Sequence, residues 1–94
     1  MVTLQDAKNY CRATDEDDTM VQSLISAAES YLDGAVGDFP LKYQNAGENW
    51  KRKADLAELM LVADWYENRT PTQRPSNSAI ELLIVQLQLE AVTT

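Results

Sequence analysis

The chain contains no histidine and a single cysteine, Cys11. Histidine is the most frequent general base and metal ligand near neutral pH, so its absence removes the usual starting point of both chemistries. One cysteine cannot form an intrachain disulfide, which is consistent with a reducing compartment, and we interpret Cys11 as a small apolar core residue. The sequence has no phosphate-binding glycine loop and no hydrolase or metalloprotease motif. Carboxylate pairs remain as a route to hydrolysis, but helix capping or solvation explains each of them, so we expect no catalytic residue, no metal and no cofactor.

Positive charge and long apolar runs are also scarce. Lysine and arginine together number 8 against 15 aspartates and glutamates, which gives a formal net charge of −7 at pH 7. Binding to a nucleic-acid backbone or an anionic membrane requires a cationic surface, so both are disfavoured. No apolar run approaches the ~18 residues of a membrane span, and the first residues lack the apolar segment of a signal peptide. We therefore expect no membrane association.

The chain of 94 residues is long enough for one domain, over residues 1–94, and too short to suggest two. Apolar residues recur at three- and four-residue spacing, and no segment shows a convincing strand pattern. We predict an all-α fold of four helices: residues 3 to about 12, 15 to about 36, about 48–69, and a short C-terminal helix from 78 to about 89. Residues 37–47, with two glycines and Pro40, are expected to be irregular.

Residues 50–69 contain neither proline nor glycine and are rich in good helix formers. Their apolar side chains cover most of the circumference of the predicted helix, which is typical of a central helix. A chain this small buries a limited share of its surface, so we expect part of this helix to contact another subunit. The candidate subunit-interface residues are Trp50, Arg52, Asp64, Trp65, Tyr66 and Arg69.

Within that set, two alternatives stay open. Trp65 and Tyr66 are either core residues or interface anchors, because aromatic side chains beside an arginine serve both roles. Asp64 stands among apolar residues and needs a partner if it is buried, such as Arg69, a backbone N–H or an arginine of another subunit. Otherwise it lies at the edge of the buried face and reaches water. For the last helix, the predicted buried face comprises Ile80, Leu83, Ile84 and Leu87, extended by Val85 and Leu89.

Four consecutive acids, which we call the acidic cluster, precede the second predicted helix: Asp15, Glu16, Asp17 and Asp18. Carboxylates are favoured at a helix N-terminus by the helix dipole. A calcium loop is excluded, because Met20 and Ser26 stand where that loop requires glycine and glutamate. We treat the cluster as a candidate partner-facing surface. One possibility is that it meets the basic residues 51–53 of a neighbouring copy.

Five segments carry a more specific pattern in this order: TLQDAKNYCR, DEDD, VQSLISAAESYLDGAVG, LAELMLVADWYENRTP and ELLIVQL. Together they resemble the small head–tail connector (adaptor) proteins of long-tailed bacteriophages over nearly the whole chain. The most specific part is LMLVADWYENR. The chain departs from the family pattern at Asp64, where histidine is common, and after the last helix, where a Leu-Arg pair is typical.

The resemblance implies an all-α structural virion protein, made in the bacterial host cytoplasm and placed at the head–tail junction. It implies a ring of about a dozen copies that contacts the portal protein and a stopper or tail-completion protein. DNA would pass through the ring without specific binding, which makes the acidic cluster a candidate channel-facing surface as well as a partner-facing one. The alternative is an acidic, soluble regulatory protein, a DNA mimic or a cap on a partner's basic groove, that forms no ring.

Overall fold

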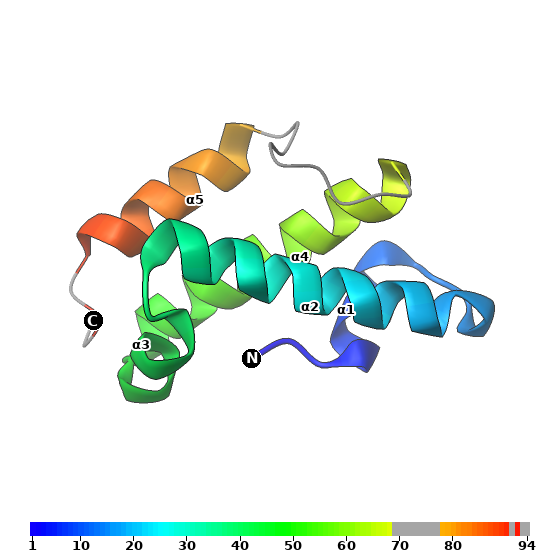
Figure 1. Cartoon of the computed structure of the whole chain (residues 1–94), viewed down its shortest axis with the longest axis horizontal. Helices are drawn as coiled ribbons and strands as arrows, with labels where there is room; N and C mark the ends of the chain where they lie inside the picture. Colours follow the sequence, from blue (N-terminus) through cyan, green and yellow to red (C-terminus); the bar gives the residue numbers. More distant parts are fainter. Residues whose placement is uncertain (69–77, 91, 93–94) are drawn as a thin grey trace.

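The computed structural model describes residues 1–68, 78–90 and 92 of the chain. These residues form five α-helices and one 3-10 turn, and no strand occurs among them (Figure 1). The elements in chain order are α1 (Leu4–Cys11), η1 (Asp15–Asp17), α2 (Asp18–Val36), α3 (Phe39–Asn45), α4 (Glu48–Asn68) and α5 (Ser78–Leu89). The predictions of an all-α fold, a long central helix and a short C-terminal helix are confirmed.

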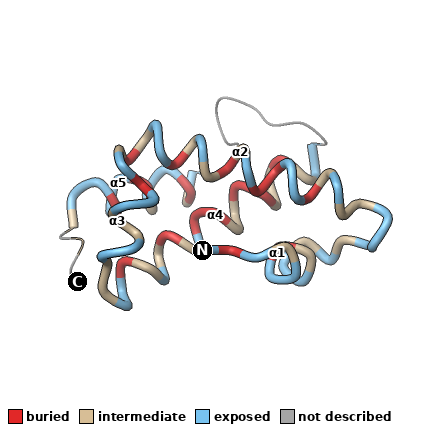
Figure 2. Tube along the Cα trace, turned by 60° about the horizontal axis from the view of Figure 1, so that its bottom comes forward, coloured by how far each residue is buried: buried red, intermediate tan, exposed pale blue. Residues whose placement is uncertain are grey.

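Helix α4 is the centre of the molecule, because it packs against each of the other four α-helices. Its 21 residues run along a particle that measures 38 × 23 × 18 Å. Figure 2 shows that buried positions follow the inner sides of α2, α4 and α5 as one continuous core. The buried residues of α4 are Trp50, Ala54, Ala57, Glu58, Leu61, Val62 and Trp65. Small alanines let neighbouring helices approach closely, and the two tryptophans fill the ends of the core.

Segment 37–47 is helical where the sequence predicted irregular structure, since α3 spans Phe39–Asn45. Gly37 and Asp38 both have positive φ, 83° and 50°, and turn the chain sharply after α2. Pro40 then lies in the first turn of α3, where its missing N–H leaves no hydrogen bond unmade. The carboxylate of Asp33 accepts a 3.0 Å hydrogen bond from the N–H of Phe39, which is fully buried. Pro40 therefore starts a short helix here instead of breaking one.

The first helix, α1, is capped at its start by Thr3. The hydroxyl of Thr3 accepts from the N–H of Asp6, and the Asp6 carboxylate accepts from the N–H of Thr3, each at 3.1 Å. This reciprocal pair is a capping box and satisfies two backbone donors that a helix start otherwise leaves unpaired. The same hydrogen bonds to Thr3 lower the pKa of Asp6. Arg12 ends α1 in a left-handed conformation with a φ of 56°.

Helix α5 is apolar on two opposite sides. Ile80, Ile84 and Leu87 are buried against the rest of the chain, as the sequence predicted. The prediction that Val85 and Leu89 extend this buried face is wrong, because both are exposed. Successive residues of a helix are rotated by about 100° about its axis, so Val85 and Leu89 lie on the side of α5 opposite the buried residues. We call the outward residues the α5 stripe: Leu82, Val85 and Leu89, with exposed fractions of 64%, 45% and 80%.

The core also contains one carboxyl group, that of Glu58 on α4. The side chain is fully buried, and no donor among the described residues hydrogen-bonds to its carboxyl oxygens. Burial is the main cause that raises the pKa of Glu58 to about 8, followed by the charge of Glu29, a hydrogen bond between these two carboxyl groups, and the charge of Asp55. The carboxyl group is therefore mainly protonated at neutral pH, because an unpaired charge in an apolar core is costly.

Replacing Trp65 with alanine should lower the free energy of unfolding by about 3–5 kcal/mol, the usual loss for a buried tryptophan. Trp65 is 1% exposed, and its ring meets that of Tyr31 edge-to-face with centroids 5.9 Å apart. Urea denaturation measures the loss. Leu56→Ala, at a position 42% exposed on the same helix, is the control and should cost much less. A Trp65→Ala protein that unfolds like the wild type would contradict the core assignment.

Glu58→Gln should remove a pH dependence of stability. The pKa of Glu58 is raised on folding, so the folded state holds an extra proton between the ordinary value of 4.5 and about 8. Stability from this group is therefore complete below the lower value and is lost as the pH rises through the upper one. The wild type should be a few kcal/mol less stable at pH 8.5 than at pH 5. Glutamine cannot ionise and should flatten this difference in urea titrations, whereas Glu16→Gln, at an exposed position, should leave it intact.

Candidate assembly surfaces

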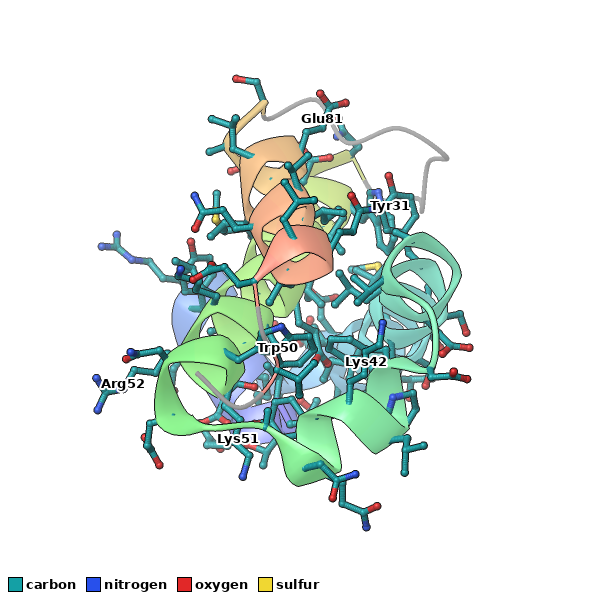
Figure 3. All side chains as sticks on the ribbon, turned by 90° about the vertical axis from the view of Figure 1, so that its left-hand side faces the viewer. Tyr31, Lys42, Trp50, Lys51, Arg52 and Glu81 are labelled. Carbon is teal, nitrogen blue, oxygen red and sulfur yellow. The ribbon has the colours of Figure 1, made fainter. Side chains whose placement is uncertain are left out.

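Two of the predicted interface residues, Trp50 and Trp65, lie in the core of the chain itself. Each is 1% exposed. The indole N–H of Trp50 donates a 3.2 Å hydrogen bond to the backbone carbonyl of Leu87, which ties the start of α4 to the end of α5. Figure 3 shows Trp50 pointing into the space between α4, α5 and α3. Both tryptophans therefore hold the subunit together, and neither presents surface to a neighbour in this structure.

The other members of that set are more accessible. Arg52 points away from the body of the molecule, with 76% of its side chain exposed and its guanidinium 3.7 Å from the Glu48 carboxylate (Figure 3). Asp64 and Tyr66 are half-buried. Asp64 lines a small hollow of about 150 Å³ on the side of α4 that faces α1. Arg69 lies outside the described residues.

Tyr66 connects the two predicted sets within one chain, because its hydroxyl donates a hydrogen bond to the carboxylate of Asp17. This bond joins the last turns of α4 to η1. The sequence separation is large, and no spacing rule links a tyrosine near the end of one helix to an acid before another. Sequence analysis assigned Tyr66 to the candidate interface set, with a core role left open, and Asp17 to the acidic cluster; the fold brings the two residues into contact.

Lys8 holds two more members of the acidic cluster. Its ammonium group contacts the carboxylates of both Asp15 and Asp18, with the second at 2.9 Å. The ion pair with Asp15 raises the pKa of Lys8 and lowers that of Asp15. Since Lys8 is on α1, these contacts fasten α1 to the start of α2. The carboxylates of Asp15 and Glu16 nonetheless remain exposed to solvent, 93% in the case of Asp15, so the cluster still presents negative charge.

The basic residues 51–53 also have partners within the chain. The ammonium of Lys51 lies 5.7 Å from the ring centre of Tyr43, and that of Lys53 pairs with Glu90. They lie at the α3 end of the molecule, whereas η1 lies at the opposite end of its longest axis (Figure 1). Contact between the two groups thus needs separate copies, and it stays a prediction.

Two accessible apolar surfaces stand out, and sequence analysis singled out neither. The first is the α5 stripe. Its signal was available in the i, i+3, i+7 spacing of Leu82, Val85 and Leu89. The second, which we call the α1–α4 groove, is an open hollow of about 510 Å³. It is lined by Val2, Asp6, Asn9, Tyr10, Asp55 and Leu59. Its two walls come from segments about fifty residues apart, so no local pattern could have indicated it.

The polar rim of the α1–α4 groove is partly fixed by the fold. Asp55 accepts a 2.8 Å hydrogen bond from the hydroxyl of Tyr43. Partial burial and this bond raise the pKa of Tyr43, so its hydroxyl stays a donor at neutral pH. Asp6 belongs to the cap of α1. The groove thus has apolar walls of Val2 and Leu59 and an edge of hydrogen-bond acceptors held in place.

The described part of the chain contains no group of three histidine, cysteine or acidic side chains positioned to hold a metal ion. Burial and the nearby Glu67 carboxylate raise the pKa of the Cys11 thiol, which therefore stays protonated at neutral pH. Cys11 is half-buried beside the core. In the same residues, no helix combines the length and the apolarity needed to cross a membrane.

Comparison with known proteins gives one finding on the family. A family model described as "Phage gp6-like head-tail connector protein" matches residues 1–89. No curated protein and no solved structure matches the chain. The matched region covers all five helices, including the α5 stripe and both sides of the α1–α4 groove. Proteins of this kind are structural components of phage virions that assemble with portal and tail proteins. The chain belongs to the phage gp6-like head-tail connector family.

Proposed function

We propose that this protein is a subunit of a ring adaptor of about a dozen copies that joins the portal vertex of the phage head to the tail or stopper. The observation that carries the proposal is the family match over residues 1–89. Residues 1–94 would form a single connector domain, made in the host cytoplasm and built into the head–tail junction. The ring would extend the channel through which DNA leaves the head.

The polar side chains that contact other helices support a structural role without catalysis. Lys8 joins α1 to α2, Tyr66 joins α4 to η1, and the indole of Trp50 joins α4 to α5. These groups hold helices in place and are not gathered around a common cavity. We propose on this basis that the protein is no enzyme and needs no cofactor.

The charge of the chain supports a passive relation to DNA. A net charge of −7 repels phosphates, so DNA would slide past such a surface without specific contacts. The acidic cluster is the strongest candidate for a channel-facing or partner-facing surface, because it lies at one end of the long axis with Asp15 and Glu16 exposed. A ring structure with this cluster on the outer rim would remove the channel role.

Mixing the purified protein with the portal protein of the same phage should produce rings stacked on the portal in negative-stain electron micrographs. The protein alone should be a monomer or weak oligomer in dilute solution, because ring contacts need the portal as template. A concentration series in light scattering measures this. A portal from an unrelated phage is the control and should gain no ring.

The rival function is an acidic regulatory protein that covers a basic groove on a partner. Such a protein would show no ring with the portal at any concentration, yet would bind a cationic protein in a salt-sensitive manner. That combination of results would replace the adaptor proposal.

A further inference from the structure

The α5 stripe is a surface that the described residues of the chain leave exposed. The opposite face of α5, made of Ile80, Ile84 and Leu87, already packs against the core. Leu82, Val85 and Leu89 face outward together at helical spacing and are 45–80% exposed. A helix that is apolar on two faces is typical of one that lies between two bodies. Here the core of the chain is the first body.

The chemistry around the stripe indicates a protein partner. Helix α5 carries no lysine or arginine, and its charged residue is the acidic Glu81 in the first turn, so it offers no positive charge to nucleic acid or to an anionic membrane. Between the leucines lies Gln86, an uncharged and exposed side chain with two amide N–H donors. The fitting surface would be a hollow with apolar walls and acceptors along its edge.

The α1–α4 groove has these properties. Val2 and Leu59 line it, Tyr10 beside it is 47% exposed, and the carboxylates of Asp6 and Asp55 stand at its edge. Helices α1 and α5 both pack on α4, yet they make no contact with each other in the residues that the structure describes. The stripe and the groove are therefore separate surfaces of one chain, and a stripe cannot reach the groove of its own copy.

We propose that the α5 stripe of one copy seats in the α1–α4 groove of the next copy, with the amide of Gln86 donating to the carboxylates at the groove edge. This rests on the proposed function, because it names the surfaces through which ring neighbours touch. A contact between two different surfaces repeats head to tail, and it closes into a ring when the rotation between copies permits.

The size of the stripe favours this arrangement over a symmetric pair. A stable two-protein interface buries about 800 Å² on each partner. Three partly exposed aliphatic side chains supply only a few hundred Å². Two stripes packed against each other would therefore form a weak dimer at best. In a ring, each copy buries its stripe and its groove at once, and closure adds contacts that no isolated pair has.

Disulfide trapping tests the contact in the full-length chain, after Cys11→Ser leaves the introduced cysteines as the only thiols. Val85→Cys and Tyr10→Cys proteins are mixed in equal amounts, at a concentration at which light scattering detects the weak oligomer. They are then oxidised, and the products are separated on a non-reducing gel. The mixed dimer should exceed either homodimer by about tenfold, because the contact raises the local thiol concentration. A chain with both substitutions should give a ladder of higher multimers.

The matched control carries Ser30→Cys, at an exposed position on α2, in place of Val85→Cys and should give no excess of mixed dimer. Leu82→Gln with Leu89→Gln should abolish trapping while leaving the melting temperature unchanged, since both positions are exposed. Symmetric Val85→Cys dimers, or no excess over the Ser30→Cys control, would overturn the proposal. Rings on the portal without trapping would overturn this contact alone, whereas trapping without rings on the portal would count against the adaptor function and leave the contact standing.

Discussion

The packing of four helices around α4 is the constraint on which the rest of the structure depends. Trp50 and Trp65 stand near its two ends, and the alanines between them allow α1, α2 and α5 to approach. Because both tryptophans are used inside the subunit, α4 has little large apolar surface to offer outside. Its exposed large apolar residue is Leu56, at 42%. Contacts with other copies would therefore involve the α5 stripe and the α1–α4 groove more than the central helix alone.

Polar contacts then fix how the outer helices sit on that centre. Lys8 with Asp15 and Asp18, and Tyr66 with Asp17, gather α1, η1, α2 and α4 at one end. At the other end, the indole of Trp50 bonds the backbone of Leu87. Each of these contacts involves a charged group or a largely desolvated one, where hydrogen bonds contribute more than at an open surface. The acidic cluster thus has two roles: it presents negative charge to solvent, and it holds α1 and α4 against the start of α2.

Much of the fold follows from local pattern. The cap at Thr3, the apolar spacing of α2 and the glycine-free stretch of α4 each specify a helix, and each is present. Segment 37–47 was predicted to be irregular because the effect of a proline depends on its position. Pro40 lies in the first turn of α3, where proline favours a helix, whereas in the interior of a helix it would interrupt one. The outward turn of Val85 and Leu89 was missed because an apolar run on a helix does not say which of its faces meets the core.

The candidate surfaces were harder to predict than the helices. Leu82 and Val85 lie three residues apart in one helix. The α1–α4 groove, in contrast, combines Val2 with Leu59, which come together only because α1 packs on α4. The bond from Tyr66 to Asp17 likewise depends on how α4 ends beside η1. Such contacts depend on how the helices pack on one another, and neither the spacing of apolar residues nor the number of charges in the sequence predicts that packing. The family resemblance predicted the structural role in the virion, whereas the α1–α4 groove could be recognised only from the coordinates.

The backbone N–H of Gly47 donates a 2.9 Å hydrogen bond to the carbonyl of Val92. This bond holds Val92 beside the junction of α3 and α4, at the end of the particle opposite η1 (Figure 1). A fluorescent protein or gold-binding peptide fused after the last residue would consequently emerge at a known pole. In micrographs of an assembled connector, the position of such a label would reveal whether α3 points toward the head or toward the tail.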